Sequence, residues 1–559
     1  MSSEKKLLLL ILLIGIFLRF FNLTWGGEYY FHPDENNIAH SVLNLSRPKL
    51  DPKFYAYGQF SPYLTYFSAQ FYNLFSFIHR QKNLNFSEVI FFLRFWSALS
   101  STAIIYLTYL IGKKFLHLRF PFSLISPLLV TFTPGLIQAA HFGTTESLLT
   151  FFFITIVYFS LNFPKTNQKK NLLIAGAMSG LAIGTKISGA IFLALPILAV
   201  IIHSIVSKKK IKLIAYQITI TVITTAVFAI LCSPYLILNY PGSSSILKYE
   251  IDIARGKVPV FYTRQFIHTI PYVFQVKKIF PYVLGWPLFT LGVIGFLLII
   301  IFLIKNLLKK DKIKNKSDIN YWLLVIGFLA YFLYNGQLFV KWTRFMTPIL
   351  PFFALFAAYN FKKTYHYLSQ KTPSPTIPYA LCFILLLSLI PGILFFASVY
   401  AQPDIRLTTS NWIYQNVPNQ STILSEAGNI LNLPLNIKNS PKQLNVINFD
   451  FYNLDSRLTL VSQLADSLNK ADYILIPSRR IFANQARLKD QFPISARYYP
   501  LLFSGQLGFS KIKEFSRLNN EIAEETWSVF DHPKIRIYKK TIPYSLNQYN
   551  NLLLNSPIY

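Results

Sequence analysis

Long, uninterrupted apolar runs constrain this chain more than any other feature of its sequence. A helix needs about 20 apolar residues to cross the hydrocarbon of a bilayer. Eleven such stretches begin near Leu7, Val89, Phe122, Ser147, Leu172, Ser188, Leu213, Leu284, Tyr321, Met346 and Tyr379. Hydrophobic residues make up 53% of the chain and charged residues 14%, which favours a membrane protein over a soluble protein with a large core. The sequence therefore predicts a polytopic α-helical membrane protein with about eleven transmembrane helices.

The distribution of positive charge predicts which loops face the cytoplasm. The net charge is +31, but Lys and Arg lie in short loops between the apolar runs, which favours membrane topology over nucleic-acid binding. Every second loop is basic and nearly free of acid: residues 113–119, 165–170, 208–212, 305–316 and 362–371. With the N-terminus, these loops are expected in the cytoplasm of a multi-pass plasma-membrane protein. The outward loops are then residues 24–87, 141–146, 239–282 and 341–344.

A change of composition near Gln402 predicts two domains. Residues 1–401 carry the apolar runs, whereas residues 402–559 have none long enough to span and are richer in Asn, Asp, Ser and Arg. Short apolar strands in the second part alternate with helical patterns, which indicates a small soluble α/β domain. Eleven spans and a cytoplasmic N-terminus place this domain outside the cytoplasm, and an error of one span would reverse that.

Two adjacent carboxylates, Asp34 and Glu35, directly follow the first apolar run. A carboxylate held at the bilayer face is suited to take a proton from a nucleophile that attacks a membrane-bound substrate. Asp after Pro is also an ordinary helix start, where the carboxylate satisfies free backbone N–H groups. The sequence leaves both interpretations open.

Short motifs in a fixed order resemble the family 39 glycosyltransferases, which have the GT-C fold and include protein O-mannosyltransferases and lipid A aminoarabinose transferases. The motifs are HPDE at 32–35 with YGQFSPYL at 57–64, HFGTTE at 141–146, GLAIGTK at 180–186 and RFMTPILP at 344–351. All of them lie within residues 7–400 and on the same expected side of the membrane. The chain departs from the family pattern at Glu146, where Asp is usual, and at Asn36 and Asn37. The resemblance implies a polyprenyl-phosphate sugar donor and a protein, lipid or glycan acceptor.

The resemblance also implies roles for individual residues. Asp34 is expected to be the general base, with Glu35 and Glu146 in the same catalytic group. Glu146 is expected either to orient sugar hydroxyls or to share a divalent cation with the first acidic pair. Side chains expected to contact substrate are His32, Tyr57, Gln59 and His141. The two histidines lack a close metal-ligand spacing, so no cofactor is assigned and a divalent cation is left open.

Three cations on the expected outer side are candidates for binding the donor phosphate. Lys186 interrupts an apolar stretch, which is costly unless it lines a wet cavity or meets an anion, although a lysine can also snorkel to the interface. The surrounding stretch forms either two short helices or one long one. Lys341 and Arg344 break the alternation of basic loops; Arg344 offers a bidentate fork to a phosphate, while Lys341 can instead anchor to headgroups.

The resemblance thus predicts one displacement at the anomeric carbon, with inversion. A transporter or lipid flippase is the alternative from another class. Transporters often contain repeated halves, and the early and late runs of this chain show no convincing repeat. A ligase that uses diphosphate-linked glycans would share the topology and differ only in its donor.

Overall fold

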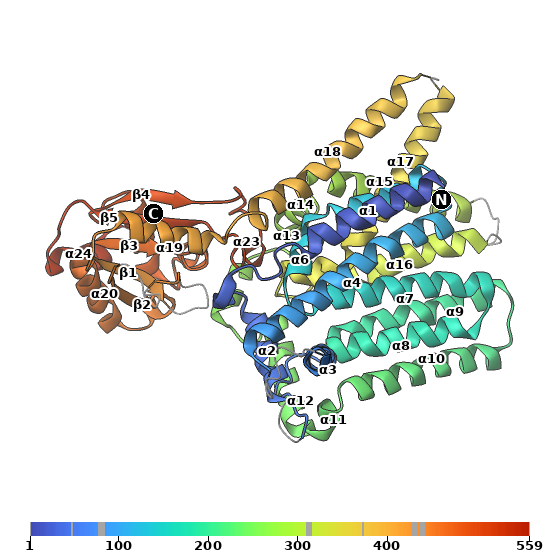
Figure 1. Ribbon diagram of the computed structural model, residues 1–559, viewed down its shortest axis with the longest axis horizontal. Coiled ribbons are helices and arrows are strands. Elements are labelled where there is room, and N and C mark those ends of the chain that lie inside the picture. Colours follow the sequence, from blue (N-terminus) through green and yellow to red (C-terminus); the bar gives the residue numbers. More distant parts are fainter. Residues whose placement is uncertain are drawn as a thin grey trace. The chain divides into compact units, whose positions relative to one another are not determined.

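The computed structural model describes residues 2–45, 49–75, 84–308, 316–371, 374–427, 433–435 and 442–557 (Figure 1). The chain divides into two compact units. The membrane unit comprises Met1–Leu23, Asp34–Lys257 and Ile270–Phe396, and the C-terminal unit comprises Thr24–Pro33, Val258–Thr269 and Ala397–Tyr559. Much of the basic segment expected at 305–316 lies outside the described residues.

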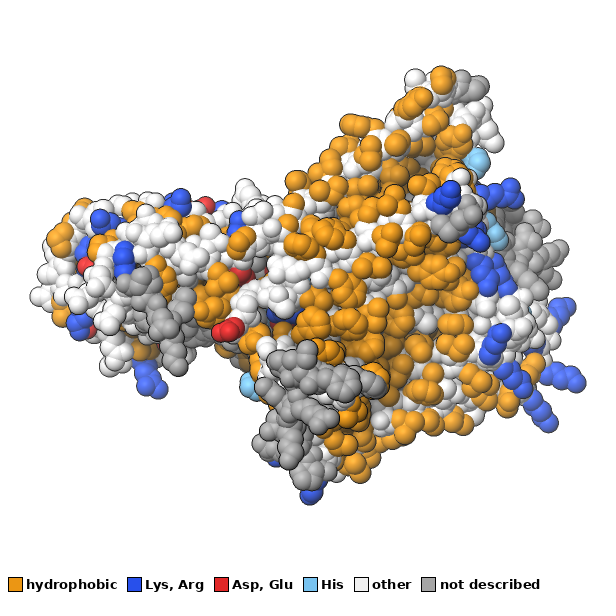
Figure 2. Space-filling view, viewed as in Figure 1, with side chains coloured by type: hydrophobic (Ala, Val, Ile, Leu, Met, Phe, Trp, Pro, Cys, Tyr) orange, Lys and Arg blue, Asp and Glu red, His pale blue; other side chains and the backbone are white. Residues whose placement is uncertain are grey.

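In the part of the chain that the structure describes, the regular elements of the membrane unit are all helical. Their bounds are α1 (Ser3–Phe20), α2 (Pro33–Asn44), α3 (Phe60–Phe75), α4 (Phe86–Phe115), η2 (Phe122–Leu124), α5 (Ile125–Thr131), α6 (Pro134–His141), α7 (Glu146–Thr166), α8 (Lys169–Thr185), η3 (Ile187–Leu193), α9 (Ala194–Val206), α10 (Ile211–Cys232), α11 (Tyr235–Leu238), α12 (Tyr240–Ala254), α13 (Val273–Lys278), α14 (Phe280–Val283), α15 (Trp286–Leu308), α16 (Lys316–Gly336), η5 (Thr343–Ile349), α17 (Leu350–Lys371) and α18 (Thr376–Val399). Apolar side chains cover the visible flank of this unit, and Lys and Arg gather at one end (Figure 2).

Seven of these helical segments are long and apolar enough to cross a membrane, or eight if the bent pair Phe122–Thr131 and Pro134–His141 forms one span. The count covers the described residues, and it supports a multi-pass membrane protein without reaching the eleven spans expected. The other three expected stretches coincide with α1, α8 and α17. The first contains Glu4, Lys5, Lys6 and Arg19, α8 has only 17 residues, and α17 is polar in its second half.

The stretch around Lys186 forms two helical segments. Helix α8 ends at Thr185, Lys186 is extended with φ −158°, and η3 begins at Ile187. Glycines let α8 approach α10 closely, because a Cβ on Gly176 or Gly180 would lie 2.8 or 2.5 Å from a carbonyl oxygen of α10. Close packing on one side and a chain reversal on the other therefore hold Lys186 at the end of α8.

The C-terminal unit is a mixed α/β fold, as the sequence predicts. Its five strands are β1 (Thr422–Ala427), β2 (Asn445–Asp450), β3 (Tyr473–Ile476), β4 (Phe509–Phe515) and β5 (Ile535–Lys540). The sheet order is β2-β1-β3-β5-β4; β2, β1 and β3 are parallel, and β5 pairs antiparallel with β3 and β4. Its helical segments are η1 (Gly27–Tyr29), η4 (Phe261–Phe266), α19 (Ile405–Asn416), η6 (Phe451–Ser456), α20 (Leu458–Lys470), α21 (Phe482–Gln485), η7 (Ala486–Leu488), α22 (Pro493–Phe503), α23 (Glu525–Ser528) and α24 (Leu546–Asn555).

Two segments that precede residue 397 belong to this unit. In the segment 258–269, Gln265 donates a hydrogen bond to Glu524, at 2.7 Å, and the ring of Phe261 lies 4.6 Å from that of Tyr452. The segment 24–33 contributes Phe31, whose ring lies 3.6 Å from the guanidinium carbon of Arg406. Parts of two expected outward loops therefore fold with the α/β sheet.

Candidate functional site

Three ion pairs in the membrane unit account for the three carboxylates expected to be catalytic. Asp34 pairs with Arg344, Glu35 with Arg94, and Glu146 with Lys186. Each carboxylate lies in the first turn of a helix, where the positive end of the helix dipole favours an anion. The pairs differ in burial, and this difference separates their possible roles.

The Glu35–Arg94 pair is completely buried. Arg94 Nη2 and Nε donate to the two Glu35 oxygens at 2.7 and 3.0 Å, and the backbone N–H of Gly143 donates to Oε1 at 2.5 Å. Arg94 also donates to the carbonyl of Leu23 at 2.7 Å. One carboxylate thus joins α2 to α4, to the end of α1 and to the loop before α7. This arrangement suits a residue that positions the site rather than one that exchanges protons with a substrate.

The Asp34–Arg344 pair is accessible. Their side chains are 18% and 23% exposed, so a substrate can reach both. Arg344 comes from η5, and its guanidinium lies over the ring of Trp342 at 4.6 Å. The pair brings residues 310 positions apart in sequence into direct contact.

The Glu146–Lys186 pair lies among aromatic rings. Lys186 Nζ donates to Glu146 Oε1 at 3.2 Å and lies over the rings of Tyr57 at 5.1 Å and Phe345 at 4.9 Å. The Lys186 side chain is 13% exposed. The ammonium is therefore oriented by a carboxylate and two ring faces, while its side chain stays partly accessible. Tyr57 thereby joins the residues that surround this site.

Gln59 lies beside Lys186 with its side chain buried. Its backbone N–H donates to Ser233 Oγ at 2.8 Å, and its Oε1 accepts from the backbone N–H of Tyr235 at 3.0 Å. Ser233 Oγ in turn donates to the carbonyl of Gly184 at 2.9 Å. Because Tyr235 requires the amide oxygen, Nε2 must point the other way, and in the described part of the chain it has no hydrogen-bond partner.

The two expected histidines contact backbone carbonyl groups and an aromatic ring. His141 is buried, with its ring nitrogens 2.8 Å from the carbonyl oxygen of Ile137 and 2.9 Å from that of Phe21. His32 belongs to the C-terminal unit, where its ring lies 4.4 Å from that of Phe530. Lys341 is also buried and donates to the carbonyl of Phe339 at 2.8 Å, and burial lowers its pKa to about 8.

A divalent cation would need several oxygen or nitrogen ligands brought together. No group of three or more His, Cys, Asp or Glu side chains that could hold a metal occurs among the described residues. The three candidate carboxylates are each held by Arg or Lys, and both His141 nitrogens face carbonyl oxygens.

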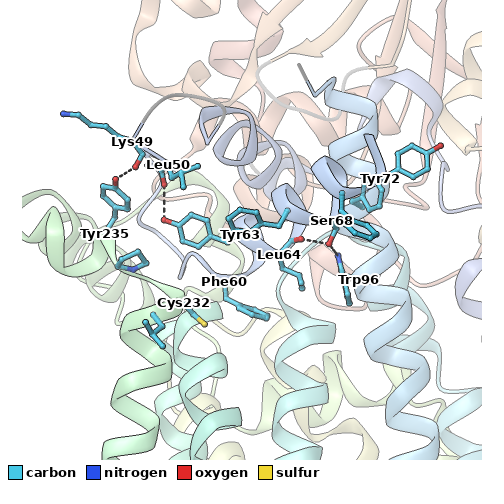
Figure 3. Close-up of a pocket in the computed structure, with 15 residues that line it drawn as sticks. Lys49, Leu50, Phe60, Tyr63, Leu64, Ser68, Tyr72, Trp96, Cys232 and Tyr235 are labelled. Atoms are coloured by element: carbon cyan, nitrogen blue, oxygen red, sulfur yellow. Dashed lines mark hydrogen bonds between the residues drawn. The ribbon is translucent and has the colours of Figure 1, made fainter. Parts of the chain in front are cut away.

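A large apolar groove includes Phe60, the residue after Gln59, in its lining (Figure 3). It has a volume of about 1010 Å³ and is lined by Lys49, Leu50, Phe60, Tyr63, Leu64, Phe67, Ser68, Phe71, Tyr72, Phe92, Trp96, Leu231, Cys232, Pro234 and Tyr235. We call this the α3 groove, because α3 contributes more of its lining than any other element, and α4 and the α10–α11 junction contribute to the rest. Two contacts connect the surroundings of the groove to the end of α8: the N–H of Gly58 donates to the carbonyl of Thr185 at 3.0 Å, and Cys232 packs on Gly184.

Arg94 and the groove are the features that sequence reasoning missed. One feature of the sequence could have identified Arg94, because a lone Arg inside an apolar helix requires a partner. Its partner, 59 residues away, could not be identified without the fold. The groove could not be predicted from the sequence, because many of its aromatic side chains come from a segment expected to be an outward loop.

Comparison with known proteins gives one family and several related folds. Residues 9–247 match the model of the family described as Dolichyl-phosphate-mannose-protein mannosyltransferase. No curated protein matches the chain. Among solved structures, the archaeal oligosaccharyltransferase AglB from Archaeoglobus fulgidus, in complex with an inhibitory peptide and a dolichol-phosphate, has a TM-score of 0.56 at 13% identity over 89% of this chain and 73% of that one.

The apo form of the A. fulgidus oligosaccharyltransferase gives a TM-score of 0.52 at 14% identity, over 89% of this chain and 72% of that one. ArnT from Cupriavidus metallidurans in the apo state gives 0.46 at 12% identity, over 96% of this chain and 98% of that one. At these identities, the two oligosaccharyltransferase structures indicate a shared fold and nothing further.

Proposed function

We propose that the chain is a polyprenyl-phosphate-sugar-dependent glycosyltransferase that transfers the sugar to an acceptor on the extracytoplasmic side. The match of residues 9–247 to the model of the Dolichyl-phosphate-mannose-protein mannosyltransferase family supports this proposal. The acceptor is a protein, lipid or glycan with a nucleophilic hydroxyl or amine. The observation that carries this proposal is the placement of Lys186 between the rings of Tyr57 and Phe345, two residues after Gly184, on which the groove residue Cys232 packs.

The α3 groove takes the isoprenoid chain of the donor. A polyprenyl chain is apolar, and burial of apolar surface stabilises binding by about 25 cal/mol per Å². Several lining side chains expose large apolar surfaces, including Phe67 at 56% and Phe71 at 64%. The lipid tail would cover these rings while its phosphate lies towards Gln59.

Lys186, Gln59 and Arg344 bind the phosphate. Lys186 supplies a positive charge, and Gln59 Nε2 supplies an N–H donor whose burial is costly without an acceptor. Arg344 contributes a planar guanidinium from the other side. All three stabilise the lipid phosphate most strongly as it leaves with its full negative charge, which is the form of electrostatic stabilisation that accelerates a reaction.

The transfer is a single displacement at the anomeric carbon. The acceptor oxygen or nitrogen forms a bond to that carbon while the bond from the carbon to the phosphate oxygen breaks. The acceptor proton passes to the Asp34 carboxylate, and the bonding electrons leave with the polyprenyl phosphate. Arg344 orients Asp34, Glu146 orients Lys186, and the configuration at the anomeric carbon inverts.

Topology follows from the same proposal. The expected alternation of basic loops puts the N-terminus in the cytoplasm, and the carboxylate sites face outward with the C-terminal unit. The structure gives seven or eight candidate spans. With the N-terminus in the cytoplasm, seven spans place the C-terminal unit outside, because the number is odd. With eight spans, one or all three of α1, α8 and α17 must cross the bilayer as well.

The direct test is a donor panel. Purified protein in detergent is incubated with radiolabelled dolichyl-phosphate mannose, glucose, galactose and N-acetylglucosamine, together with a membrane extract as the acceptor source. We expect release of dolichyl phosphate and labelled product from one of these donors, and loss of this release in Lys186→Ala. Lys257→Ala is the matched control, since Lys257 is 65% exposed and pairs only with Asp252 at 3.8 Å. Movement of intact donor across a vesicle bilayer without release of lipid phosphate would identify a flippase instead.

A further inference from the structure

Ser233 is a polar residue that interrupts the apolar lining of the α3 groove. Cys232 precedes it, Pro234 and Tyr235 follow it, and all three line the groove (Figure 3). Ser233 itself is only 3% exposed and forms the C-terminal cap of α10. Its hydroxyl group therefore needs partners within the protein, because a buried hydroxyl without a hydrogen bond is costly. No step of the proposed mechanism uses this residue.

The hydroxyl of Ser233 joins the two segments that carry Gln59 and Lys186. Its oxygen accepts a hydrogen bond from the backbone N–H of Gln59, at 2.8 Å, and donates one to the carbonyl of Gly184, at 2.9 Å. Gln59 directly precedes α3, and Gly184 lies two residues before Lys186. One side chain at the end of α10 thus connects the start of α3 with the end of α8.

The end of α8 requires such partners, because the last carbonyl groups of a helix have none within the helix. Ser233 satisfies the carbonyl of Gly184. The backbone N–H of Gly58 satisfies the carbonyl of Thr185, at 3.0 Å. The two segments approach closely, since a Cβ on Gly58 would lie 2.1 Å from the carbonyl oxygen of Gly184. These hydrogen bonds therefore fix the point at which the chain leaves α8 and enters Lys186.

We propose that Ser233 is a positioning residue for donor binding, which holds Lys186 and Gln59 in the arrangement that the lipid phosphate requires. This inference rests on the proposed function, because it assumes that these two side chains bind that phosphate. The single proton of the Ser233 hydroxyl is donated to Gly184, so the group has no hydrogen left to donate to an anion. Ser233 therefore acts through its two neighbours and not as a phosphate ligand.

The test compares one lipid with and without its phosphate. Equilibrium binding of dolichyl phosphate and of dolichol to the full-length protein is measured in detergent. We expect Ser233→Ala to weaken binding of dolichyl phosphate by roughly 2- to 12-fold, as for loss of one neutral hydrogen bond, and to leave dolichol binding unchanged. Equal weakening of both lipids would indicate damage to the groove, and weakening of neither would show no role in binding; either result overturns the proposal.

Thr225→Val is the matched control. Thr225 lies on the same helix as Ser233, and its Oγ1 donates to the carbonyl of Gly176 in α8, at 3.1 Å. This substitution removes a hydrogen bond between the same two helices, roughly two helical turns before Gly184. We expect both variants to lower the melting temperature, but only Ser233→Ala to weaken binding of dolichyl phosphate. The same loss of binding in Thr225→Val would show that Ser233 has a purely structural role.

A double variant tests whether Ser233 acts through Lys186. Lys186→Ala alone should weaken binding of dolichyl phosphate, and the further effect of Ser233→Ala should be smaller in that background than in the wild type. An equal effect in both backgrounds overturns the proposal. If Lys186→Ala alone has no effect, the proposed phosphate site is wrong as well, whereas failure of the Ser233 comparisons alone leaves the proposed function intact. If Ser233→Ala does not fold, Ser233→Cys, which keeps the shape with a weaker hydrogen-bonding group, takes its place, and the same outcomes decide.

Discussion

Substitution of Glu35 by Gln separates a positioning carboxylate from a catalytic one. Glu35 is completely buried and accepts three hydrogen bonds, two from Arg94 and one from the backbone of Gly143. Glu35→Gln preserves the size of the side chain but removes its charge. The guanidinium of Arg94 would then remain buried without a counterion.

The magnitude follows from this burial. Removal of one partner of a buried ion pair typically costs about 3–5 kcal/mol, mainly because the other charge stays uncompensated. The amide oxygen of Gln can still accept one bond from Arg94, so we expect a loss near the lower limit, about 3 kcal/mol. A second substitution, Arg94→Met, removes the isolated charge, and the double variant should be more stable than Glu35→Gln alone.

The assay is thermal unfolding in detergent, read by intrinsic fluorescence, together with donor turnover at a temperature where the variants remain folded. We expect the apparent melting temperature of Glu35→Gln to fall by several degrees while measurable turnover remains at low temperature. A Glu35→Gln protein that melts like the wild type but has lost turnover would show that Glu35 takes part in the chemistry. Glu35 would then be a catalytic carboxylate and not a positioning one.

Three further predictions concern topology, the phosphate site and the C-terminal unit. In a background without the two native cysteines, Ser245→Cys should react with an impermeant thiol reagent in intact cells and Ser207→Cys should not; the reverse labelling would overturn the orientation. Lys186→Ala and Arg344→Ala should each weaken donor use by roughly 10- to 150-fold, corresponding to about 1.5–3 kcal/mol. Normal donor affinity in both variants would show that these cations only help to set the membrane topology. Burial raises the pKa of the Glu426 carboxyl from 4.5 to about 8, so between these pH values the folded state binds more protons than the unfolded state. The free energy of unfolding therefore falls as the pH rises through this range, by at most about 5 kcal/mol at about 1.4 kcal/mol per pH unit. Glu426→Gln should flatten this pH dependence of the melting temperature, and an unchanged slope would refute the assignment.

The sequence predicts the local elements of this protein well, because hydrophobic runs dictate helices in a bilayer. All eleven expected apolar stretches are helical, and the break at Lys186 forms one of the two arrangements that the Gly-rich stretch allowed. The α/β character of the C-terminal unit is likewise confirmed. The number of spans is less certain from sequence, because α1 and α8 contain charges or are too short to satisfy a simple hydropathy criterion.

Contacts between distant segments could not be predicted in the same way. The pairing of Glu35 with Arg94 and the location of segment 258–269 in the C-terminal unit depend on side chains far apart in sequence. The order of the family motifs anticipates that Asp34 and Arg344 lie near each other, but not that they pair directly. The α3 groove could not be predicted for a different reason. Helix α3 lies in a segment that was expected to be a loop because of its polar and aromatic residues.

The most direct test of the proposed mechanism is turnover by Asp34→Asn. Asn keeps the size of the side chain and is a good helix cap, but it cannot accept the acceptor proton. We predict a fall in turnover of about 10²–10⁴-fold, the usual contribution of a general base, with donor binding and melting temperature close to those of the wild type. Asp51→Asn in the same segment, where Asp51 accepts from Tyr55 at 2.8 Å, is the control and should remain active. Full activity in Asp34→Asn would contradict the account, because Asp34 could then only begin a helix.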